Sequence, residues 1–284
     1  MNTDQTDKVN TSWDKAFLLF LASILAGACL VLAAAFLIGD SSRLITSDGN
    51  AYYAWLPTVL IDHDLEFSNN FRDLYQPDPV PDDRTRTPKG LLINKCPVGM
   101  AIIEMPGFLA GHAVARLGAG AADGASSPYQ IAVTAWLLIL YLAGSYLLFL
   151  SLRRHEVRGG LAFLFVAMAL VGTNLIHYVA KEPAMPHAAN VMLMSLLLFA
   201  STSEHGGRRA DLLAGLILGL LLITRNATLA MAPWLLYLLC RRNASPRRLA
   251  FMAGGLAVMA LIHMLSFYLL WGRLVFRTYG SEGF

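Results

Sequence analysis

Long apolar runs alternate with short polar segments along the chain, the pattern of a protein that crosses a membrane several times. The first run, Ala16–Gly39, carries no charge and is longer than the roughly 20 residues that cross a hydrocarbon core, so it predicts a retained first helix. Six further spans are predicted at Tyr129–Leu150, Leu161–Ala180, Ala188–Thr202, Leu212–Ile223, Ala227–Cys240 and Leu249–Trp271. The pattern therefore predicts an all-α, polytopic helical membrane protein with about seven transmembrane helices, preceded by a polar cytoplasmic tail over residues 1–15.

Pro97–Leu117 is long enough to cross the membrane but contains Glu104, Pro106 and Arg116. An interfacial helix tolerates such charges, whereas a spanning helix must bury or pair them. If this segment lies along the outer interface, the arginine-rich segment 153–158 falls on the same side as the N-terminus, as the positive-inside rule favours. We therefore expect interfacial helices within a long outer loop over residues 40–128, inside one transmembrane domain over residues 16–284.

The basic short segments set the expected orientation. Arginines cluster at 153–158, 208–209 and 241–248, all on the N-terminal side when seven spans are threaded. The prediction is a multi-pass protein of the inner (plasma) membrane with a cytoplasmic N-terminus. On the outer side, the long loop is expected to meet the short Lys181–Pro186 turn, and the runs flanking residues 224–226 predict a tilted or partly sunken hairpin.

Composition agrees with a membrane protein and excludes several other classes. The chain has 284 residues, 56% hydrophobic and 14% charged, against about 45–50% and 25% in soluble domains. A net charge of +3 with scattered basic residues does not favour a nucleic-acid partner. Three cysteines, two of them in apolar runs, predict no disulfide framework and no metal site.

The acidic outer loop holds two candidate motifs. Asp48 is followed by Gly49 and by the paired aromatics Tyr52 and Tyr53. At the membrane surface such surroundings raise the pKa of a carboxylate by desolvation, which suits it to act as a base. The alternative is that Asp48 forms an Asx turn that starts the next helix. The pair Asp62 and Asp64 has the spacing of carboxylate ligands for a hard divalent ion, with a plain polar link as the alternative.

Three further sites put ionisable groups near membrane depth. Glu182 and His187 lie in the second outer turn, either facing a ligand or belonging to a proline-shaped turn. Arg225 interrupts an apolar stretch, where a charge costs about 2.5–3.5 kcal/mol, so it predicts a partner such as a phosphate or a buried carboxylate. Lys95, just before Pro97, is a second candidate for that phosphate or for lipid headgroups.

The order of these motifs resembles the multispanning GT-C glycosyltransferases, in particular the bacterial branch related to protein O-mannosyltransferases and the lipid A aminoarabinose transferase. The resemblance rests on an acid opening the outer loop (residues 47–53), a proline-introduced amphipathic helix (96–106), an acid in the second outer turn (Glu182) and a basic residue after a later span (224–226). It covers most of the chain from about Ala16, with loose motifs.

Membership would imply inverting transfer of a sugar from a polyprenyl-phosphate donor to a lipid, glycan or protein acceptor at the outer face. By this resemblance Asp48 matches the general base, Glu182 the second-loop acid, and Arg225 and Lys95 the residues that hold the donor phosphate. We add His187, Tyr52 and Tyr53 to the expected substrate- and phosphate-binding residues. Some relatives use a divalent metal such as Mg or Mn and others do not, and Asp62 and Asp64 do not decide between them.

Relatives have more spans and often a C-terminal outer domain, so we expect this chain to be the front part of a larger transferase, a split gene product or a minimal form. Two other functions compete: a multispanning transporter or lipid flippase, and an inactive assembly subunit. A transporter predicts inverted repeats or broken helices in matching halves, and the sequence pattern shows neither.

Overall fold

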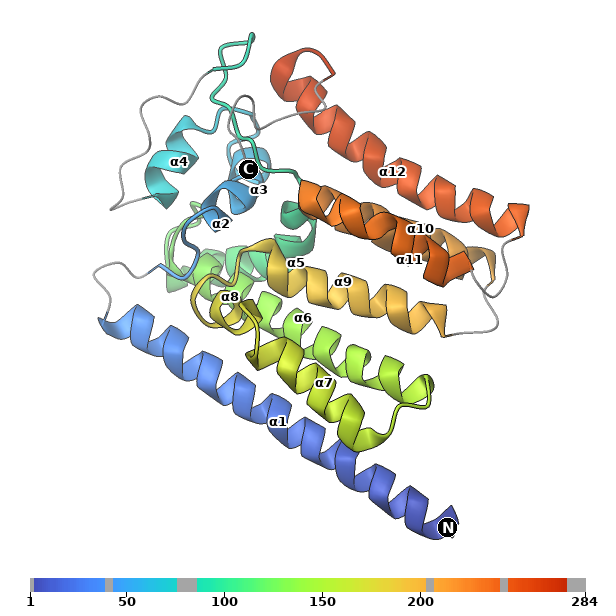
Figure 1. Cartoon of the computed structure of the whole chain (residues 1–284). Coiled ribbons are helices and arrows are strands. Elements are labelled where there is room, and N and C mark those ends of the chain that lie inside the picture. The colour runs from blue at the N-terminus through green and yellow to red at the C-terminus, as the bar shows by residue number, and fades with distance from the viewer. Residues whose placement is uncertain (1–2, 39–42, 76–85, 203–206, 241–244, 275–284) are drawn as a thin grey trace.

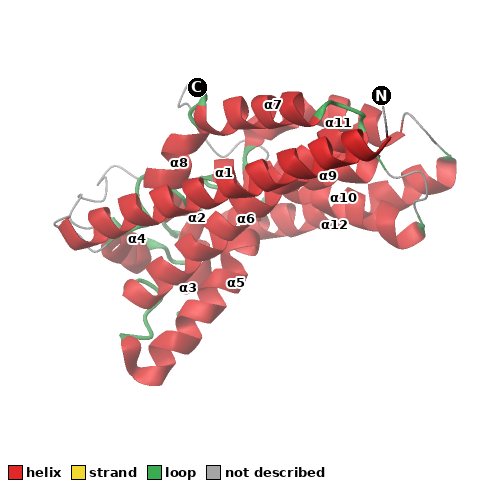
Figure 2. Cartoon of the chain, turned by 90° about the horizontal axis from the view of Figure 1, so that it is seen from below, coloured by secondary structure: helices red, strands yellow, loops and turns green. Residues whose placement is uncertain are grey.

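The computed structural model is an all-helical bundle and describes residues 3–38, 43–75, 86–202, 207–240 and 245–274. The α-helices are α1 (Thr3–Ile38), α2 (Gly49–Tyr53), α3 (Trp55–Leu60), α4 (Ser68–Leu74), α5 (Gly99–Val114), α6 (Ser127–Arg154), α7 (Gly159–Val171), α8 (Leu175–Lys181), α9 (Pro186–Ser201), α10 (Arg208–Thr224), α11 (Ala232–Cys240) and α12 (Pro246–Trp271). A π-helical turn, η1 (Ala115–Ala119), follows α5, and a 3₁₀ segment, η2 (Asn226–Met231), separates α10 from α11. Figure 2 shows helices and loops throughout the described part of the chain, with no strand.

The long helices lie side by side, and the short ones gather at one end. In Figure 1, α1 lies along one edge of the bundle and α12 along the opposite edge, with α6, α7, α9 and α10 between them. The helices of the predicted outer loop, α2, α3 and α4, lie at the end of the bundle away from the start of α1 (Figure 1). The described part of the predicted outer loop therefore contains helices, and α1 already begins at Thr3, inside the segment predicted as a tail.

The prediction of seven spans is wrong for the described residues. Three helices are long and apolar enough to cross a membrane: Ser12–Ala34 of α1, α6 and α12. A fourth span is possible if α7 and α8, bent by 57° at the break between them, count as one. This number of apolar helices suggests a multi-pass membrane protein.

Several predicted spans are too short as helices to cross a membrane. The 16 residues of α9 extend about 24 Å at 1.5 Å per residue, against a hydrocarbon core of about 30 Å. The 17-residue α10 begins with two arginines and Asp211, and α11 has only 9 residues. Hydropathy marks these segments as apolar but does not measure how far the unbroken helix extends.

The helices approach one another through glycines, as membrane helices do. A Cβ atom on Gly144 of α6 would lie 2.6 Å from the Met192 Cα of α9. Gly215 of α10 and Gly255 of α12 face each other's helices in the same way, with Cβ positions 2.0 Å from Met252 O and 2.3 Å from Leu212 O. Such contacts let backbones pack closely where apolar burial gives little driving force.

Two hydrophobic cores result from this packing. One joins α1, α6, α7 and α8, where Phe17 stacks on Phe149 with ring centroids 4.3 Å apart and Trp13 covers Gly159. The other joins the outer-loop helices to α5, α6, α9, α10 and α12 and includes Tyr53, Phe67 and Phe108. The outer faces remain apolar, since only 11% of the most apolar stretch of α12 is buried.

The close contact of α10 and α12 can be tested at two neighbouring glycines. We expect Gly255→Ala to lower the midpoint of thermal unfolding in detergent, because its Cβ would lie 2.3 Å from Leu212 O and 2.6 Å from Leu216 N, and overpacking costs about 1–3 kcal/mol. The matched control is Gly254→Ala, which has nothing within 4 Å of its Cβ and should be neutral or stabilising. Equal effects of the two substitutions would contradict the helix packing described here.

Candidate functional site

Helix α10 ends at Thr224, and Arg225 lies in the break between α10 and η2. Thr224 is the last helical residue, and Arg225 is extended with φ −159° and ψ 133° before η2 begins. The Thr224 hydroxyl donates to Asn190 Oδ1 of α9 (2.8 Å), and the Thr228 hydroxyl lies 2.6 Å from the Arg225 carbonyl and 2.8 Å from that of Leu221. The carbonyl groups of Leu221 and Arg225 at the end of α10 therefore have hydrogen-bond partners. The helix therefore ends where the sequence predicted the tip of a hairpin at residues 224–226, although neither flanking helix is among the candidate spans.

The guanidinium of Arg225 contacts His187. Arg225 Nη1 lies 3.2 Å from His187 Nε2, and the imidazole stacks on the ring of Tyr178 with centroids 3.7 Å apart. Burial, and secondarily the charge of Arg225, lower the pKa of His187 to about 4. His187 is therefore neutral near pH 7, with Nε2 as the acceptor of an Arg225 N–H. Among the residues that the structure describes, no carboxylate pairs with Arg225, which was its structural alternative.

A pocket opens beside this pair at the break between α7 and α8. It has a volume of about 430 Å³ and is lined by Thr173, Asn174, Leu175, Tyr178 and His187. The break itself was missed, because Leu161–Ala180 was predicted as one continuous helix. Glycine, threonine and asparagine in succession at 172–174 were the signal for it.

The two predicted acids lie at the same end of the bundle. A Cβ on Gly49 would lie 3.0 Å from the Ala184 Cβ, so the start of α2 packs against the turn that carries Glu182. Asp48 is exposed and Glu182 half-buried, and neither side chain has a hydrogen bond or ion pair among the described residues. The Asp48 carboxylate makes no capping bond, so the Asx turn considered for it is absent; its backbone carbonyl starts α2 instead.

Lys95 belongs to a segment held between α2 and the end of α10. Asn94 Nδ2 donates to Ala51 O (2.8 Å), and the Trp55 indole N–H donates to Cys96 O (2.9 Å). A Cβ on Gly99, at the start of α5, would lie 2.3 Å from Ile223 O. These contacts place the half-buried Lys95 in the connection between the outer-loop helices and the Arg225 break.

Tyr52 and Tyr53 lie in the core beneath the site. Both are at most 3% exposed. The Tyr53 hydroxyl donates to Gly124 O, and its ring lies 5.9 Å from that of Phe108. Burial raises the pKa of the Tyr53 hydroxyl well above its ordinary value. The structure thus brings together five predicted residues (Asp48, Lys95, Glu182, His187 and Arg225) at one end and places the two tyrosines in the packing that supports α2.

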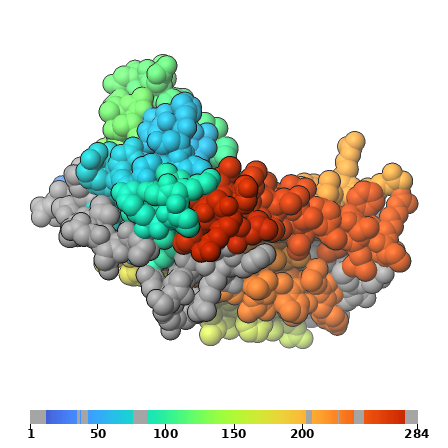
Figure 3. All heavy atoms as spheres, turned by 90° about the horizontal axis from the view of Figure 1, so that it is seen from above, coloured from blue at the N-terminus to red at the C-terminus, as the bar shows by residue number. Residues whose placement is uncertain are grey.

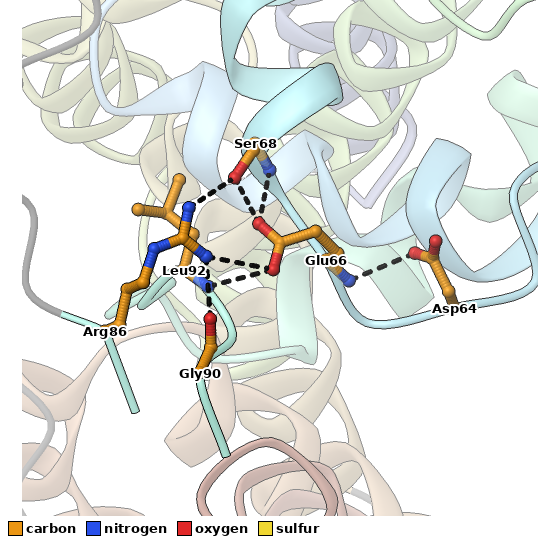
Figure 4. A network of polar contacts seen from close by, with 6 residues as sticks. All are labelled: Asp64, Glu66, Ser68, Arg86, Gly90 and Leu92. Carbon is orange, nitrogen blue, oxygen red and sulfur yellow. Dashed lines mark hydrogen bonds and ion pairs between the residues drawn. The ribbon is translucent and has the colours of Figure 1, made fainter. Parts of the chain in front are cut away.

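The carboxylates at 62–66 organise their own loop. Asp62 Oδ2 accepts from Asn70 Nδ2 (2.6 Å), and Asp64 Oδ1 accepts from the Glu66 amide (3.0 Å). Figure 4 shows Glu66 at the centre of a network in which its carboxylate faces Ser68, the Leu92 amide and Arg86 (3.4 Å). Within the ranges that the structure describes, no group of three or more His, Cys, Asp or Glu side chains is placed to hold a metal ion.

The same network fixes the turn at 86–92 to the last helix. Arg86 Nη1 donates to Gly90 O (2.6 Å), and the Lys89 ammonium donates to Leu269 O of α12 (2.8 Å). Figure 3 shows the segment following residue 86 directly beside the end of α12. A cation at the carbonyl end of a helix complements its dipole, so this contact stabilises the end of α12.

Glu104 is a residue whose place the sequence did not indicate. The interfacial hypothesis assumed that it faces polar surroundings, but it is fully buried, and neither carboxylate oxygen has a hydrogen-bond partner among the described residues. It shares a helix face with the buried Met100 and Phe108, four residues away on either side, which was the available signal. Burial raises the pKa of this carboxyl well above its ordinary value, so Glu104 is held as the neutral acid.

Replacing Glu104 should change how stability depends on pH. At low pH the carboxyl is protonated in both states; as pH rises past its ordinary pKa, only the unfolded state ionises freely, so stability is lost. We expect Glu104→Gln to remove this loss. Between pH 5 and 8 in detergent, the midpoint of thermal unfolding should therefore fall less steeply with pH in the variant than in the wild type. Glu156→Gln, at an exposed acid, is the control and should follow the wild type. Parallel curves for wild type and Glu104→Gln would contradict the burial of a neutral acid.

Compared with protein-family models, with curated proteins and with solved structures, the chain gives no match. The site is therefore described by its own geometry. It combines a cation in a helix break, a neutral histidine stacked on tyrosine, an open pocket and two free carboxylates, all at one end of a helical bundle.

Proposed function

We propose that this chain is a membrane glycosyltransferase of the GT-C kind, moving a sugar from a polyprenyl-phosphate-linked donor to a lipid, glycan or protein acceptor at the outer face of the membrane. The observation that carries the proposal is the contact of Arg225 with a neutral His187 beside an open pocket. An arginine that pairs with no carboxylate in the described part of the chain suits a phosphate, which guanidinium binds in a bidentate manner.

The leaving group explains why a cation is needed. In the proposed step the acceptor oxygen attacks C1 of the sugar, the C1–O bond to phosphate breaks, and its electron pair leaves on the phosphate oxygen. In this proposal Arg225, together with Lys95 of the segment before α5, stabilises the charge that develops there. His187 is neutral and accepts from Arg225, so it orients the guanidinium without adding a carboxylate that would compete with phosphate.

The acids supply the proton acceptor. In this account Asp48 takes the proton of the acceptor hydroxyl, and Glu182, on the neighbouring turn, acts as the second acid of the site. Support comes from the packing of Gly49 on Ala184 and from the absence of hydrogen-bond partners for both carboxylates among the described residues. A base must be free to reach its substrate, and neither of these carboxylates is bonded to another described residue.

The orientation proposed for the protein follows from the two ends of the bundle. The arginines at 153–154, 208–209 and 247–248 lie at the ends of α6, α10 and α12 that are opposite to the site. There Arg248 pairs with the buried Asp211 at 2.9 Å. We place this end in the cytoplasm with the N-terminus, which puts the site at the outer face of the inner (plasma) membrane.

A lipid flippase or transporter is the second candidate, and one observation favours it. The segments α7 and α8 are bent by 57° at the break between them, where the sequence pattern indicated a continuous helix, and α10 ends before Arg225, where the tip of a hairpin was predicted. Broken helices whose ends meet at membrane depth form substrate sites in transporters. The two proposals share lipid-phosphate binding and differ in whether a glycosidic bond is made.

Substituting the two acids tests the proposal. We expect Asp48→Asn and Glu182→Gln each to abolish transfer from a polyprenyl-linked sugar, because the proton acceptor or its partner acid is lost, while membrane insertion is unchanged. Transfer is measured as release of polyprenyl phosphate from a labelled donor in proteoliposomes. Asp73→Asn, at an exposed acid whose ion pair is with the adjacent Arg72, is the matched control and should retain activity. Wild-type turnover in both site variants would overturn the enzyme proposal, and donor movement across the bilayer without transfer would favour the flippase.

A further inference from the structure

The pocket at the α7–α8 break is lined by two aromatic rings and by the side chains of Thr173, Asn174 and Leu175. We propose that it holds the sugar ring of the lipid-linked donor, with Asn174 as the side chain that binds the sugar hydroxyls. This inference rests on the proposed function and adds to it the place of the sugar and a residue that selects it. Neither Asn174 nor the break was indicated as functional by the sequence pattern.

The backbone at the break is held rigid, which leaves one polar side chain free. The Thr173 hydroxyl donates to Ala169 O (2.6 Å) and accepts from the Leu175 amide (3.3 Å), so both of its roles are used within the chain. The Asn174 side chain is exposed and has no hydrogen-bond partner among the described residues. Its amide offers two donors and an acceptor, the combination that matches neighbouring hydroxyl groups.

Two of the residues that line the pocket are aromatic rings stacked on each other. Tyr178 and His187 stack with ring centroids 3.7 Å apart and an interplanar angle of 16°. Both residues line the pocket, and none of the five lining residues carries a charge when His187 is neutral. An aromatic wall with a few polar groups is the usual construction of small-molecule sites, and the volume of about 430 Å³ falls in the range of about 300–1,000 Å³ typical of them.

The position of the pocket fits a ligand that is joined to phosphate. His187 lines it and contacts Arg225 through Nε2 at 3.2 Å, so a phosphate on Arg225 lies next to the pocket. Met168 and Val171, on the turn of α7 that leads to the break, are 59% and 46% exposed. This apolar surface offers the polyprenyl chain a path away from the pocket, with the sugar at the break and the phosphate at Arg225.

Binding measurements with and without the sugar test the inference. The ligands are polyprenyl phosphate and polyprenyl-phosphate mannose, glucose and arabinose, titrated against the full chain in nanodiscs. We expect Asn174→Ala to raise the Kd of the tightest sugar-bearing donor by about ten-fold, the size expected for lost hydrogen bonds, and to leave the Kd of polyprenyl phosphate unchanged. Tyr178→Phe, which keeps the stacked ring, should bind like the wild type, and Tyr178→Leu should lose affinity for sugar-bearing donors.

The outcomes separate this inference from the proposed function. Asn69→Ala, the same substitution on α4 away from the pocket, is the control for general effects on folding. If wild type binds and transfers but Asn174→Ala binds every donor like wild type, or weakens polyprenyl phosphate equally, the sugar pocket is wrong and the transferase stands. If wild type binds neither polyprenyl phosphate nor its glycosides, the proposed function fails and the inference fails with it.

Discussion

The first turn of α5 lies directly against the last turn of α10, and there is no room for a side chain where they meet. A Cβ on Gly99 would lie 2.3 Å from Ile223 O and 2.7 Å from Thr224 N, so only glycine allows this approach. The contact brings the segment of Lys95 to the end of α10, and the hydrogen bond from Asn94 to Ala51 brings α2 with it. Gly49 on Ala184 then completes the assembly of two loops and a helix break at one end of the bundle. The site depends on these two close backbone contacts.

Charged and polar groups lie inside this apolar protein where each one costs stability. Arg225 has a histidine rather than a carboxylate as its partner, and Glu104 is buried with no partner among the described residues and a raised pKa. Around Arg225 the structure compensates locally, since the Thr228 hydroxyl lies within hydrogen-bond distance of the Leu221 and Arg225 carbonyl groups and the Thr224 hydroxyl bonds Asn190 of α9. Around Glu104 it compensates by protonation. Only the first arrangement keeps a charged group beside the pocket at the α7–α8 break.

Hydropathy predicted where most of the long helices are, and the charge of Arg225 marked the end of α10, but neither measured helix continuity. The run Tyr129–Leu150 is α6, extended by a few residues at each end, and the break at 224–226 is where the charge of Arg225 indicated it. The run Leu161–Ala180 is not one helix, because the succession Gly172, Thr173 and Asn174 interrupts it without removing its apolar character. The burial of Glu104 and the stacking of Tyr178 on His187 arise from tertiary contacts between distant segments, which no local pattern contains.

The claim that Arg225 receives a lipid-linked phosphate is the one on which the functional account depends. The most direct measurement is the affinity of the purified chain in nanodiscs for polyprenyl phosphate, comparing wild type with Arg225→Met and with Arg116→Met, at an exposed arginine in η1. The account predicts saturable binding by wild type and Arg116→Met, with a Kd raised about ten-fold or more in Arg225→Met, since hydrogen bonds between charged groups contribute about 1.5–3 kcal/mol. Equal affinity of all three proteins would assign Arg225 to the packing of α9 and α10 and would contradict a phosphate site at the helix break.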